Sequence, residues 1–241
     1  MSTPSTTSIT AVVLAGGWGT RLRSVVADRP KVLAAVSGKP FLAYLLDQIA
    51  AAGITHTVLC VGYRGGQIQA AFGEAYAGMC LAYSQETTLL GTGGALRLAL
   101  PLIASETFIA MNGDSFCEVN LTDLWVWHHA RQANATLVLT PKSDTARYGR
   151  VSLSADGVIS GFEEKGSTAG SGWVNAGIYV FGSEIVRTIP PGRAVSLEHE
   201  VFPSWIGHRL YGYQNWGRFL DIGTPESYAK ADALLATYRR S

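Results

Sequence analysis

Short apolar runs alternate with amphipathic segments between residue 10 and about residue 140. The runs TAVVLA, THTVLCVG, MCLAYSQE, ETFIAMNGD and ATLVLTP have the length and hydrophobicity of strands buried on both faces. FLAYLLDQIAAAG repeats large apolar residues at steps of three and four, from Phe41 to Ile49, and stops at Gly53, so it predicts an amphipathic helix. Similar patterns predict helices in GGQIQAAFG, GGALRLALPLI and LTDLWVWHHARQAN, the last with Thr122 as its N-cap.

The pattern changes after the run ATLVLTP. YGRVSLSADGVISGFEEK holds two runs of alternating polarity around Asp156 and Gly157, which is typical of a β-hairpin. WVNAGIYVF, RLYGYQNW and RFLDIG predict strands, EIVRTIP a short helix, and TPESYAKADALLATYRR a closing helix with Thr224 as N-cap and Pro225 in its first turn. The chain therefore predicts an α/β fold: a Rossmann-like three-layer sandwich with a mostly parallel central sheet and a β-rich C-terminal half.

The composition excludes several classes of protein. Hydrophobic residues make up 47% of the 241 residues, which supports a sizeable core, and 19 Lys and Arg balance 18 Asp and Glu, so no strong field attracts nucleic acid. No apolar run reaches the roughly 18 residues of a membrane span, and the polar start MSTPSTTSIT does not have the pattern of a signal peptide, so we expect a cytoplasmic protein. The three cysteines suggest neither a disulfide framework nor a zinc site, and we expect Cys60 and Cys80 to be buried in strands.

The segment LAGGWGTRLRSVVADRPK packs glycines behind the first strand. Gly16, Gly17 and Gly19 leave backbone N–H groups open to a bound phosphate. The loop fits neither the dinucleotide fingerprint nor the P-loop, so a tight structural turn is the alternative. Arg21 favours phosphate binding because a guanidinium contacts phosphate oxygens in pairs, and Lys31 adds a second cation whose direction the preceding proline restricts. The residues alone therefore favour a diphosphate or triphosphate site.

The segments QETTLLGTGGAL, NGDSF, FEEKG and FLDIGTPESY follow along the chain. Together with LAGG-x-GTRL and its PK, they occur in the same order as the signature segments of the sugar-1-phosphate nucleotidyltransferases. The chain resembles this family over about residues 10–235. The Ser- and Thr-rich residues 1–9 predict a flexible lead-in, and the pattern after them predicts a single domain over 10–241. The resemblance implies a nucleotide-binding part at about 10–140 and a sugar-phosphate-binding part at about 141–241.

The resemblance also implies which residues meet each substrate. The implied nucleotide-binding residues are Leu14, Ala15, Gly16, Gly17, Gly19, Thr20, Arg21, Gln85, Glu86, Gly91 and Thr92. The implied sugar-phosphate-binding residues are Asn112, Gly149, Glu164, Lys165, Asn175 and Gly177. Asp114 and Asp221 would hold one Mg²⁺, and the implied catalytic residues are Arg21, Lys31 and Lys165.

The implied reaction joins a nucleoside triphosphate to a sugar 1-phosphate and releases pyrophosphate. RPKVLAAVSGKPFLAYLLDQIAAAGI, YGRV and SLEHEVFP most resemble the D-glycero-D-manno-heptose 1-phosphate guanylyltransferases, which favours GTP, that heptose 1-phosphate, and a product used for bacterial surface polysaccharide. A uridylyltransferase or other nucleotidyltransferase that acts on a hexose 1-phosphate or N-acetylmuramate 1-phosphate stays open. Family members commonly self-associate, so a homo-oligomer is also consistent with the resemblance.

Two other classes of protein make different demands on the sequence. A glycosyltransferase would normally carry a DxD motif where this chain has NGDSF, and a non-catalytic regulatory homologue would have lost cations or metal carboxylates that this chain keeps. Trp18 departs from the family's usual loop. It would either lie at the rim and cover loop backbone, or place its ring over the bound nucleotide.

Overall fold

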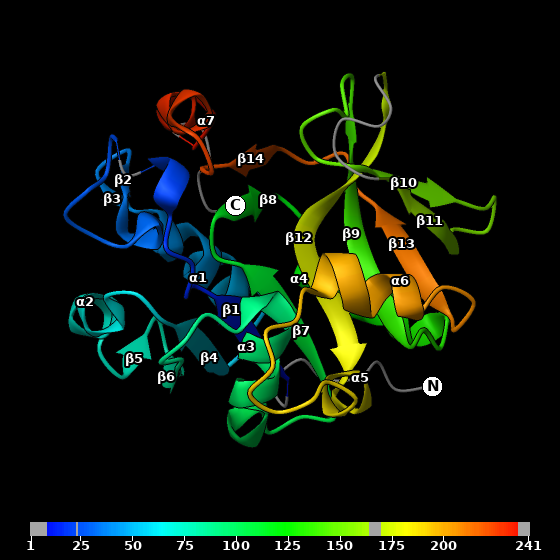
Figure 1. Ribbon diagram of the computed structural model, residues 1–241, viewed down its shortest axis with the longest axis horizontal. Coiled ribbons are helices and arrows are strands. Elements are labelled where there is room, and N and C mark those ends of the chain that lie inside the picture. Colours follow the sequence, from blue (N-terminus) through cyan, green and yellow to red (C-terminus); the bar gives the residue numbers. More distant parts are fainter. Residues whose placement is uncertain (1–8, 23, 164–169, 236–241) are drawn as a thin grey trace.

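The computed structural model describes residues 9–22, 24–163 and 170–235, and within them ten strands form one central sheet beside two small strand pairs (Figure 1). The strands are β1 (Thr10–Leu14), β2 (Ala35–Val36), β3 (Lys39–Pro40), β4 (His56–Val61), β5 (Ala75–Tyr76), β6 (Met79–Gln85), β7 (Thr107–Asn112), β8 (Ser115–Cys117), β9 (Ala135–Lys142), β10 (Arg150–Leu153), β11 (Ile159–Glu163), β12 (Gly172–Gly182), β13 (Leu210–Gln214) and β14 (Phe219–Asp221). The helices and helical turns are η2 (Thr20–Leu22), η3 (Lys31–Leu33), α1 (Phe41–Ala51), α2 (Gly65–Phe72), α3 (Gly91–Ala99), η4 (Leu100–Leu102), α4 (Leu121–Ala130), α5 (Ser183–Arg187), η5 (Leu197–Val201), α6 (Phe202–Ser204), α7 (Pro225–Ala229) and α8 (Ala231–Leu235).

The first half of the chain builds a parallel sheet. β1 lies between β4 and β7 and pairs in parallel with both, and β4 continues in parallel to β6. Thr10 to Val13 of β1 are all buried, as the apolar run predicted. Because the strands are parallel, their C-terminal ends share one edge of the sheet, where ligands bind in folds of this kind.

The second half adds antiparallel strands to the same sheet. β12 pairs antiparallel with β7 and β9, β13 runs parallel to β9, and β10 with β11 forms the hairpin predicted around Asp156. The register of β12 against β9 shifts between Asn175 and Tyr179, and Gly177 in this stretch has a φ of +77°. A Cβ on Gly177 would be strained and would lie 2.6 Å from Oγ of Ser115. The irregular stretch thereby lies against the chain that follows β7.

Helices cover both faces of the sheet and enclose two apolar cores (Figure 1). Residues of α1, α2, α4 and α8 belong to the first core, and residues of α3, α5, η5 and α6 belong to the second. In β1, Ala11 and Val13 face the first core while Val12 faces the second, as the alternation of a strand requires. The predicted three-layer α/β fold is confirmed. Across the described ranges, none of the helices is long and apolar enough to cross a membrane.

The N-cap predicted at Thr122 is wrong. α4 begins at Leu121, two residues before the start that a cap at Thr122 implies, and Asn120 is its cap: Oδ1 of Asn120 accepts hydrogen bonds from the backbone N–H groups of Thr122 and Asp123 at 3.0 and 3.2 Å. Asn ranks above Thr as an N-cap, and here it immediately precedes the first apolar residue of the helix. Thr122 therefore lies inside the first turn.

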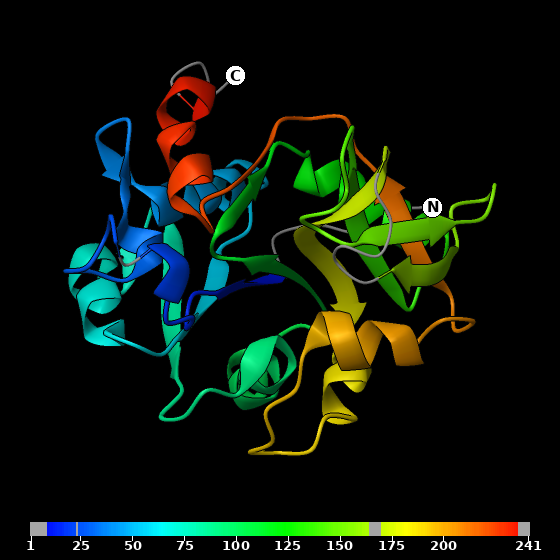
Figure 2. The ribbon, with the colours of Figure 1, turned by 45° about the horizontal axis from the view of Figure 1, so that its top comes forward.

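The single closing helix predicted from Thr224 onward is two short helices, α7 and α8, separated at Lys230. Thr224 caps α7 through a capping box, as predicted. The break directs α8 against the β2–β3 hairpin, where the N–H of Ser37 donates to the carboxylate of Asp232. Figure 2 shows these red helices beside the blue hairpin, which is far from them in sequence.

The expectation for the cysteines is only half correct. Cys60 is buried, whereas Cys80 is exposed. Buried and exposed side chains alternate at the start of β6. Met79 and Leu81 face the first core, so Cys80 points to the opposite face of the sheet, where it is exposed.

Candidate active site

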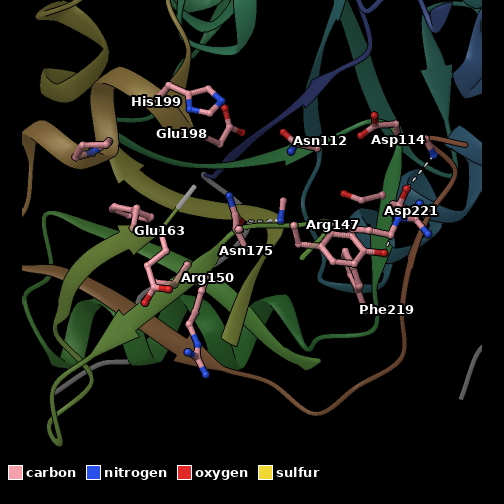
Figure 3. Close-up of a pocket in the computed structure, with 18 of the residues that line it drawn as sticks. Asn112, Asp114, Arg147, Arg150, Glu163, Asn175, Glu198, His199, Phe219 and Asp221 are labelled. Carbon is pink, nitrogen blue, oxygen red and sulfur yellow. Dashed lines mark hydrogen bonds between the residues drawn. The ribbon is translucent and has the colours of Figure 1, made fainter. Parts of the chain in front are cut away.

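A cavity of about 550 Å³ lies where β7 ends, and its walls come from β10, β12, β14 and η5. Figure 3 shows Asp114 and Asp221 on one side of this cavity and Glu198 on another, with Asn112 and Asn175 between them. We refer to these two parts as the Asp114 end and the Glu198 end. The predicted site residues that line the cavity are Arg21, Asn112, Asp114, Gly149, Asn175, Gly177 and Asp221.

Two glycines of the loop after β1 lie in close contact with neighbouring side chains. A Cβ on Gly16 would lie 2.4 Å from Oε1 of Glu86. Gly19 has a φ of +59°, and a Cβ there would lie 3.1 Å from Cβ of Lys31. Gly17, in contrast, faces open space. Its backbone is therefore accessible to a phosphate group, as the sequence predicted for the loop.

The other loop residues divide between sheet and cavity. The carbonyl of Leu14 and the N–H of Ala15 make hydrogen bonds to neighbouring strand ends, so both continue the sheet up to the glycines. The backbone of Thr20 opens η2, and Arg21 in the same turn is exposed and lines the cavity. The structure therefore brings a guanidinium from the glycine loop to the Asp114 end.

Lys31 and Asp114 form an ion pair across the two segments that the sequence analysis treated separately. Nζ of Lys31 lies 2.5 Å from Oδ2 of Asp114. Pro30, with a φ of −56°, immediately precedes η3, which begins at Lys31. The Lys31 side chain is 13% exposed and that of Asp114 is 40% exposed, so the carboxylate is the more accessible partner.

A small antiparallel pair brings the two predicted metal ligands to the same place. β14 pairs with β8, with Asp221 opposite Ser115, and the N–H of Ile222 donates to the carbonyl of Asp114 at 2.9 Å. Oδ1 of Asp221 accepts a hydrogen bond from the N–H of Gly223 at 3.0 Å. Two carboxylates therefore face one cavity from adjoining strand ends.

This donor set fits a magnesium ion. Mg²⁺ in nucleotide sites is held by one or two carboxylates, while water and substrate phosphates supply the other oxygens. Asp114 and Asp221 provide that number, and both line the cavity. The described residues contain no group of three or more His, Cys, Asp or Glu side chains that could hold a metal without substrate. The fit therefore depends on phosphate oxygens completing the coordination.

Tyr148 contacts Asp221 and was not singled out from the sequence. Its hydroxyl donates to Oδ2 of Asp221 at 2.7 Å. Burial, followed by the hydrogen bond and the charge of Asp221, raises the pKa of Tyr148 to about 12, so the hydroxyl remains a donor at neutral pH. Nζ of Lys142 lies 4.6 Å from the ring of Phe219 in the same cluster, and burial lowers the pKa of Lys142 while the charge of Asp221 opposes that shift.

The predicted base-facing segment follows β6. Nε2 of Gln85 donates to the carbonyl of Gly62 at 3.1 Å, so the Gln85 amide is tied to the loop after β4. Oε2 of Glu86 accepts from the N–H of Leu90 at 3.2 Å, which leaves Oε1 beside Gly16. Burial raises the pKa of the Glu86 carboxyl, and the hydrogen bond from Leu90 partly opposes this. Glu86 is therefore an acceptor held at the glycine loop.

Gly91 and Thr92 begin α3 and contact the segment before η5. Gly91 has a φ of +68°, and a Cβ there would lie 2.6 Å from the carbonyl oxygen of Val195. Oγ1 of Thr92 accepts from the N–H of Leu197 at 2.8 Å and donates to Glu198 at 3.0 Å. The segment predicted to face the base is thus joined to the Glu198 end of the cavity.

The Glu198 end contains a hydrogen-bond network that centres on Tyr179. Nδ2 of Asn112 and Nδ2 of Asn175 lie 3.3 and 2.9 Å from the Tyr179 hydroxyl, which lies 3.0 Å from Oε1 of Glu198. Gly149, with a φ of +75°, begins the neighbouring wall, as the resemblance implied for a glycine in this pocket. The structure brings these predicted polar residues together.

Two predicted residues lie outside the described part of the chain, and several residues of the site were not predicted. Glu164 and Lys165 lie outside the described residues, although Glu163 lines the cavity. Sequence reasoning missed a further set of cavity or network residues: Arg147, Tyr148, Arg150, Tyr179, Glu198 and His199. The arginines flank Tyr148 and Gly149 in RYGR, and Glu198 belongs to SLEHEVFP, so both segments had been noticed without a chemical role.

Trp18 lies at the rim of the glycine loop. Its side chain is 50% exposed, and its ring lies 6.0 Å from that of Tyr63 at an interplanar angle of 33°. Tyr63 follows β4, so the pair joins two loops at the C-terminal edge of the sheet. A rim position was one of the two expectations for Trp18, and a role over the nucleotide stays a prediction.

Comparisons with known proteins are consistent with this geometry. The family described as "Nucleotidyl transferase" matches residues 10–237. The mannose-1-phosphate guanylyltransferase of Mycobacterium tuberculosis is 36% identical over 95% of this chain, which spans 65% of that protein's length. The D-glycero-alpha-D-manno-heptose 1-phosphate guanylyltransferase of Aneurinibacillus thermoaerophilus is 34% identical over 95% of this chain and 99% of that protein.

Solved structures give the same relationship. The crystal structure of HddC from Yersinia pseudotuberculosis has a TM-score of 0.83 and 30% identity, and covers 93% of this chain and 98% of that one. HddC has also been crystallised in complex with GMP-PN, and this structure has a TM-score of 0.81. A putative glucose-1-phosphate thymidylyltransferase from Bacillus anthracis has a TM-score of 0.87 at 20% identity and covers 97% of each chain, which supports the fold alone.

Proposed function

Because the chain belongs to the nucleotidyl transferase family, we propose that it joins GTP to a sugar 1-phosphate to give a GDP-sugar and pyrophosphate. The family and enzyme class expected from the ordered motifs are thereby confirmed. The observation that carries the proposed reaction is the meeting of Arg21, Asp114 and Asp221 at one end of a cavity beside the glycine loop.

The proposed step needs charge placement more than proton transfer. An oxygen of the sugar phosphate attacks the α-phosphorus of GTP, the bond to the bridging oxygen of the β-phosphate breaks, and pyrophosphate leaves with that electron pair. The attacking oxygen is already an anion at neutral pH, so no general base is required. The protein must instead hold two mutually repelling anions in line.

The side chains of the Asp114 end suit that task. We assign Arg21 and the open backbone at Gly17 to the β- and γ-phosphates. Lys31, which pairs with Asp114 in the structure, would exchange part of that contact for the α-phosphate. The resemblance assigns Lys165 to the sugar phosphate. Asp114 and Asp221 would hold a Mg²⁺, which would supply positive charge near the reacting phosphates.

Glu86 supports GTP as the nucleotide. Guanine presents two adjacent N–H donors on its pairing edge, and a carboxylate can accept both. Glu86 is held beside Gly16 with one oxygen bound to the N–H of Leu90, which is the kind of fixed acceptor that such recognition needs. The relatives named guanylyltransferases give independent support for the same base.

The proposal also ranks the candidate sugar 1-phosphates. We favour D-glycero-D-manno-heptose 1-phosphate on the resemblance of YGRV and SLEHEVFP, with a product for surface polysaccharide. The 36% identity to a mannose-1-phosphate guanylyltransferase supports mannose 1-phosphate as the second candidate. Uridylyl transfer to glucose 1-phosphate or N-acetylmuramate 1-phosphate is the more distant alternative.

One assay tests base and sugar together. Pyrophosphate release is measured with GTP, ATP, UTP and dTTP against heptose, mannose, glucose and N-acetylmuramate 1-phosphates in Mg²⁺. We expect the largest kcat/KM with GTP and the heptose. A larger value with mannose 1-phosphate would replace the sugar, activity with UTP alone would replace the base, and no release from any pair would exclude the enzyme activity.

A further inference from the structure

Glu198 places a negative charge at the end of the cavity away from the Asp114–Asp221 pair (Figure 3). It lies on η5, a π-helical turn, and such turns are rare and concentrate at functional sites. Ser196 caps this turn by accepting from the N–H of His199 at 3.2 Å. The backbone at Glu198 is therefore held independently of the contacts that its side chain makes.

Three hydroxyl groups hold the carboxylate in one orientation. Oε2 of Glu198 accepts from Oγ1 of Thr92 at 3.0 Å and from Oγ of Ser196 at 3.1 Å. Oε1 accepts from the Tyr179 hydroxyl at 3.0 Å. A carboxylate oxygen accepts about two hydrogen bonds, so Oε2 has its full number and Oε1 has one position left. Because Glu198 lines the cavity, that position is available to a ligand.

The direction of these hydrogen bonds is determined by two asparagines. The Tyr179 hydroxyl accepts from Nδ2 of Asn175 at 2.9 Å and from Nδ2 of Asn112 at 3.3 Å, so its own proton is directed to Glu198. The amide of Asn175 cannot be reversed without loss, because its Oδ1 accepts from the N–H of Gly177 at 2.9 Å. Glu198 therefore ends a chain of donors and acts only as an acceptor.

Building on the proposed function, we propose that Glu198 is a specificity-determining residue for the sugar: its Oε1 accepts a hydrogen bond from one hydroxyl of the sugar ring. A negatively charged side chain repels phosphate, so it also orients the substrate with its phosphate toward Arg21 and the Asp114 end. The substrates that fit are sugars with an uncharged, hydroxyl-bearing side opposite the phosphate. Uronic acids and sugar bisphosphates are disfavoured at that side.

The rejection of the wrong sugar follows from the rigid network. A substrate without the recognised hydroxyl would leave Oε1 with an unfilled position in a partly enclosed site, and such sites discriminate strongly against analogues that lack a hydrogen-bonding group. The network cannot turn away to compensate, because Thr92, Ser196 and Tyr179 all hold the same carboxylate.

The test compares E198Q with wild type by pyrophosphate release, using GTP, the best sugar 1-phosphate of the panel and its monodeoxy analogues. E200Q is the matched control, because Glu200 lies on the same turn but is exposed and pairs with Arg193. In E198Q the NH2 group must face either Tyr179 or the hydroxyls of Thr92 and Ser196, all of which donate to Glu198, so the held acceptor is disrupted in either orientation. For this variant we expect the KM for the sugar 1-phosphate to rise about tenfold or more, with the KM for GTP within about twofold. One deoxy analogue should cost wild type a similar factor and cost E198Q nothing further.

Three outcomes overturn the inference. They are an E198Q variant with unchanged sugar KM, a variant whose KM for GTP rises as much as that for sugar, and equal further losses on every deoxy analogue. If wild type releases no pyrophosphate from any pair of substrates, the proposed function fails and the inference fails with it. An active wild type with an unaltered E198Q variant overturns the inference alone.

Discussion

Each end of the cavity contains a carboxylate, but the two carboxylates have different kinds of partner. At the Asp114 end a carboxylate pairs with a cation of the same chain, Lys31, at 2.5 Å. At the Glu198 end a carboxylate is held by three neutral hydroxyls. The first arrangement keeps opposite charges together until substrate charges exchange with them, whereas the second keeps one negative charge in a fixed place.

This difference separates the two kinds of effect that substitutions should have. Under the proposed function, changes at the Asp114 end would remove charge that stabilises the transition state, so they should lower kcat. Changes at the Glu198 end would remove contacts that are made equally in the ground state and the transition state, so they should raise the KM for the sugar.

The largest effect is expected at the carboxylate pair. Asp114→Asn and Asp221→Asn should each lower kcat about a thousandfold, because each removes a charge that would hold the metal and its bound phosphates. Asp123→Asn, at an exposed position in the first turn of α4, is the control and should keep activity. Circular dichroism melts check folding, and near-normal turnover in either site variant would remove that carboxylate from the mechanism.

Lys31→Met should have the next largest effect. We expect kcat to fall about a hundredfold, since a cation next to the α-phosphate acts on charge that develops during the reaction. Lys39→Met is a matched control, because Lys39 forms a similar ion pair with Asp47 at 2.7 Å away from the cavity. If both variants lose activity equally, the loss reflects a broken ion pair and not a role in phosphoryl transfer.

Tyr148→Phe should have an intermediate effect, which should appear in the Mg²⁺ dependence of the rate. The hydroxyl positions Asp221, and loss of such a supporting contact typically weakens metal binding by about tenfold. The concentration of Mg²⁺ needed for half-maximal rate should rise, while turnover at saturating Mg²⁺ is largely restored. Tyr83→Phe removes a hydroxyl that donates to the carbonyl of Gly73 and should leave the Mg²⁺ dependence unchanged.

His128 lies outside both ends of the cavity, and its titration affects how the stability of the fold depends on pH. Burial lowers its pKa to about 3 in the fold, against 6.5 in the unfolded chain, and its Nδ1 lies 2.8 Å from Oγ1 of Thr136. Between these values the unfolded chain binds more protons, so this residue's contribution to stability is complete above pH 6.5 and is lost as the pH falls toward 3. Its share of the slope is at most about 1.4 kcal/mol per pH unit.

Urea unfolding of wild type and His128→Gln at several pH values between 7.5 and 4.5 measures that share as the difference between the two slopes. The wild-type curve should fall more steeply below about pH 6.5 than that of the variant. His208→Gln, at an exposed position, should keep the wild-type slope. Parallel curves for wild type and His128→Gln would contradict a buried neutral imidazole.

The sequence was sufficient for elements with strong local signals. The parallel strands, the hairpin at Asp156 and the cap at Thr224 follow from hydrophobic period and turn chemistry, which are properties of neighbouring residues. Thr122 was wrongly predicted as the N-cap of α4 because Asn120 competes for the same helix end. The closing helix was predicted too long because its break at Lys230 carries no glycine or proline.

The residues of the candidate site also divide into those with a local sequence signal and those without one. Segments with a recognisable order gave Arg21, Asp114 and Asp221, and the structure brings them to one cavity. Glu198 and Tyr179 could not be chosen from the sequence, since their chemistry exists only where η5, β12 and α3 meet. Contacts between distant segments have no local signature, so these residues require the fold.

The pairing of β14 with β8 joins two parts of the candidate site that lie far apart in the sequence. Asp114 ends the parallel half of the sheet, whereas Asp221 comes from a strand near the closing helices. A ribosome-bound chain that has not yet released residue 221 can contain every parallel strand β1, β4, β6 and β7 and still have only one of the two carboxylates. Under the proposed function, a chain that stops before residue 221 would consume no nucleotide.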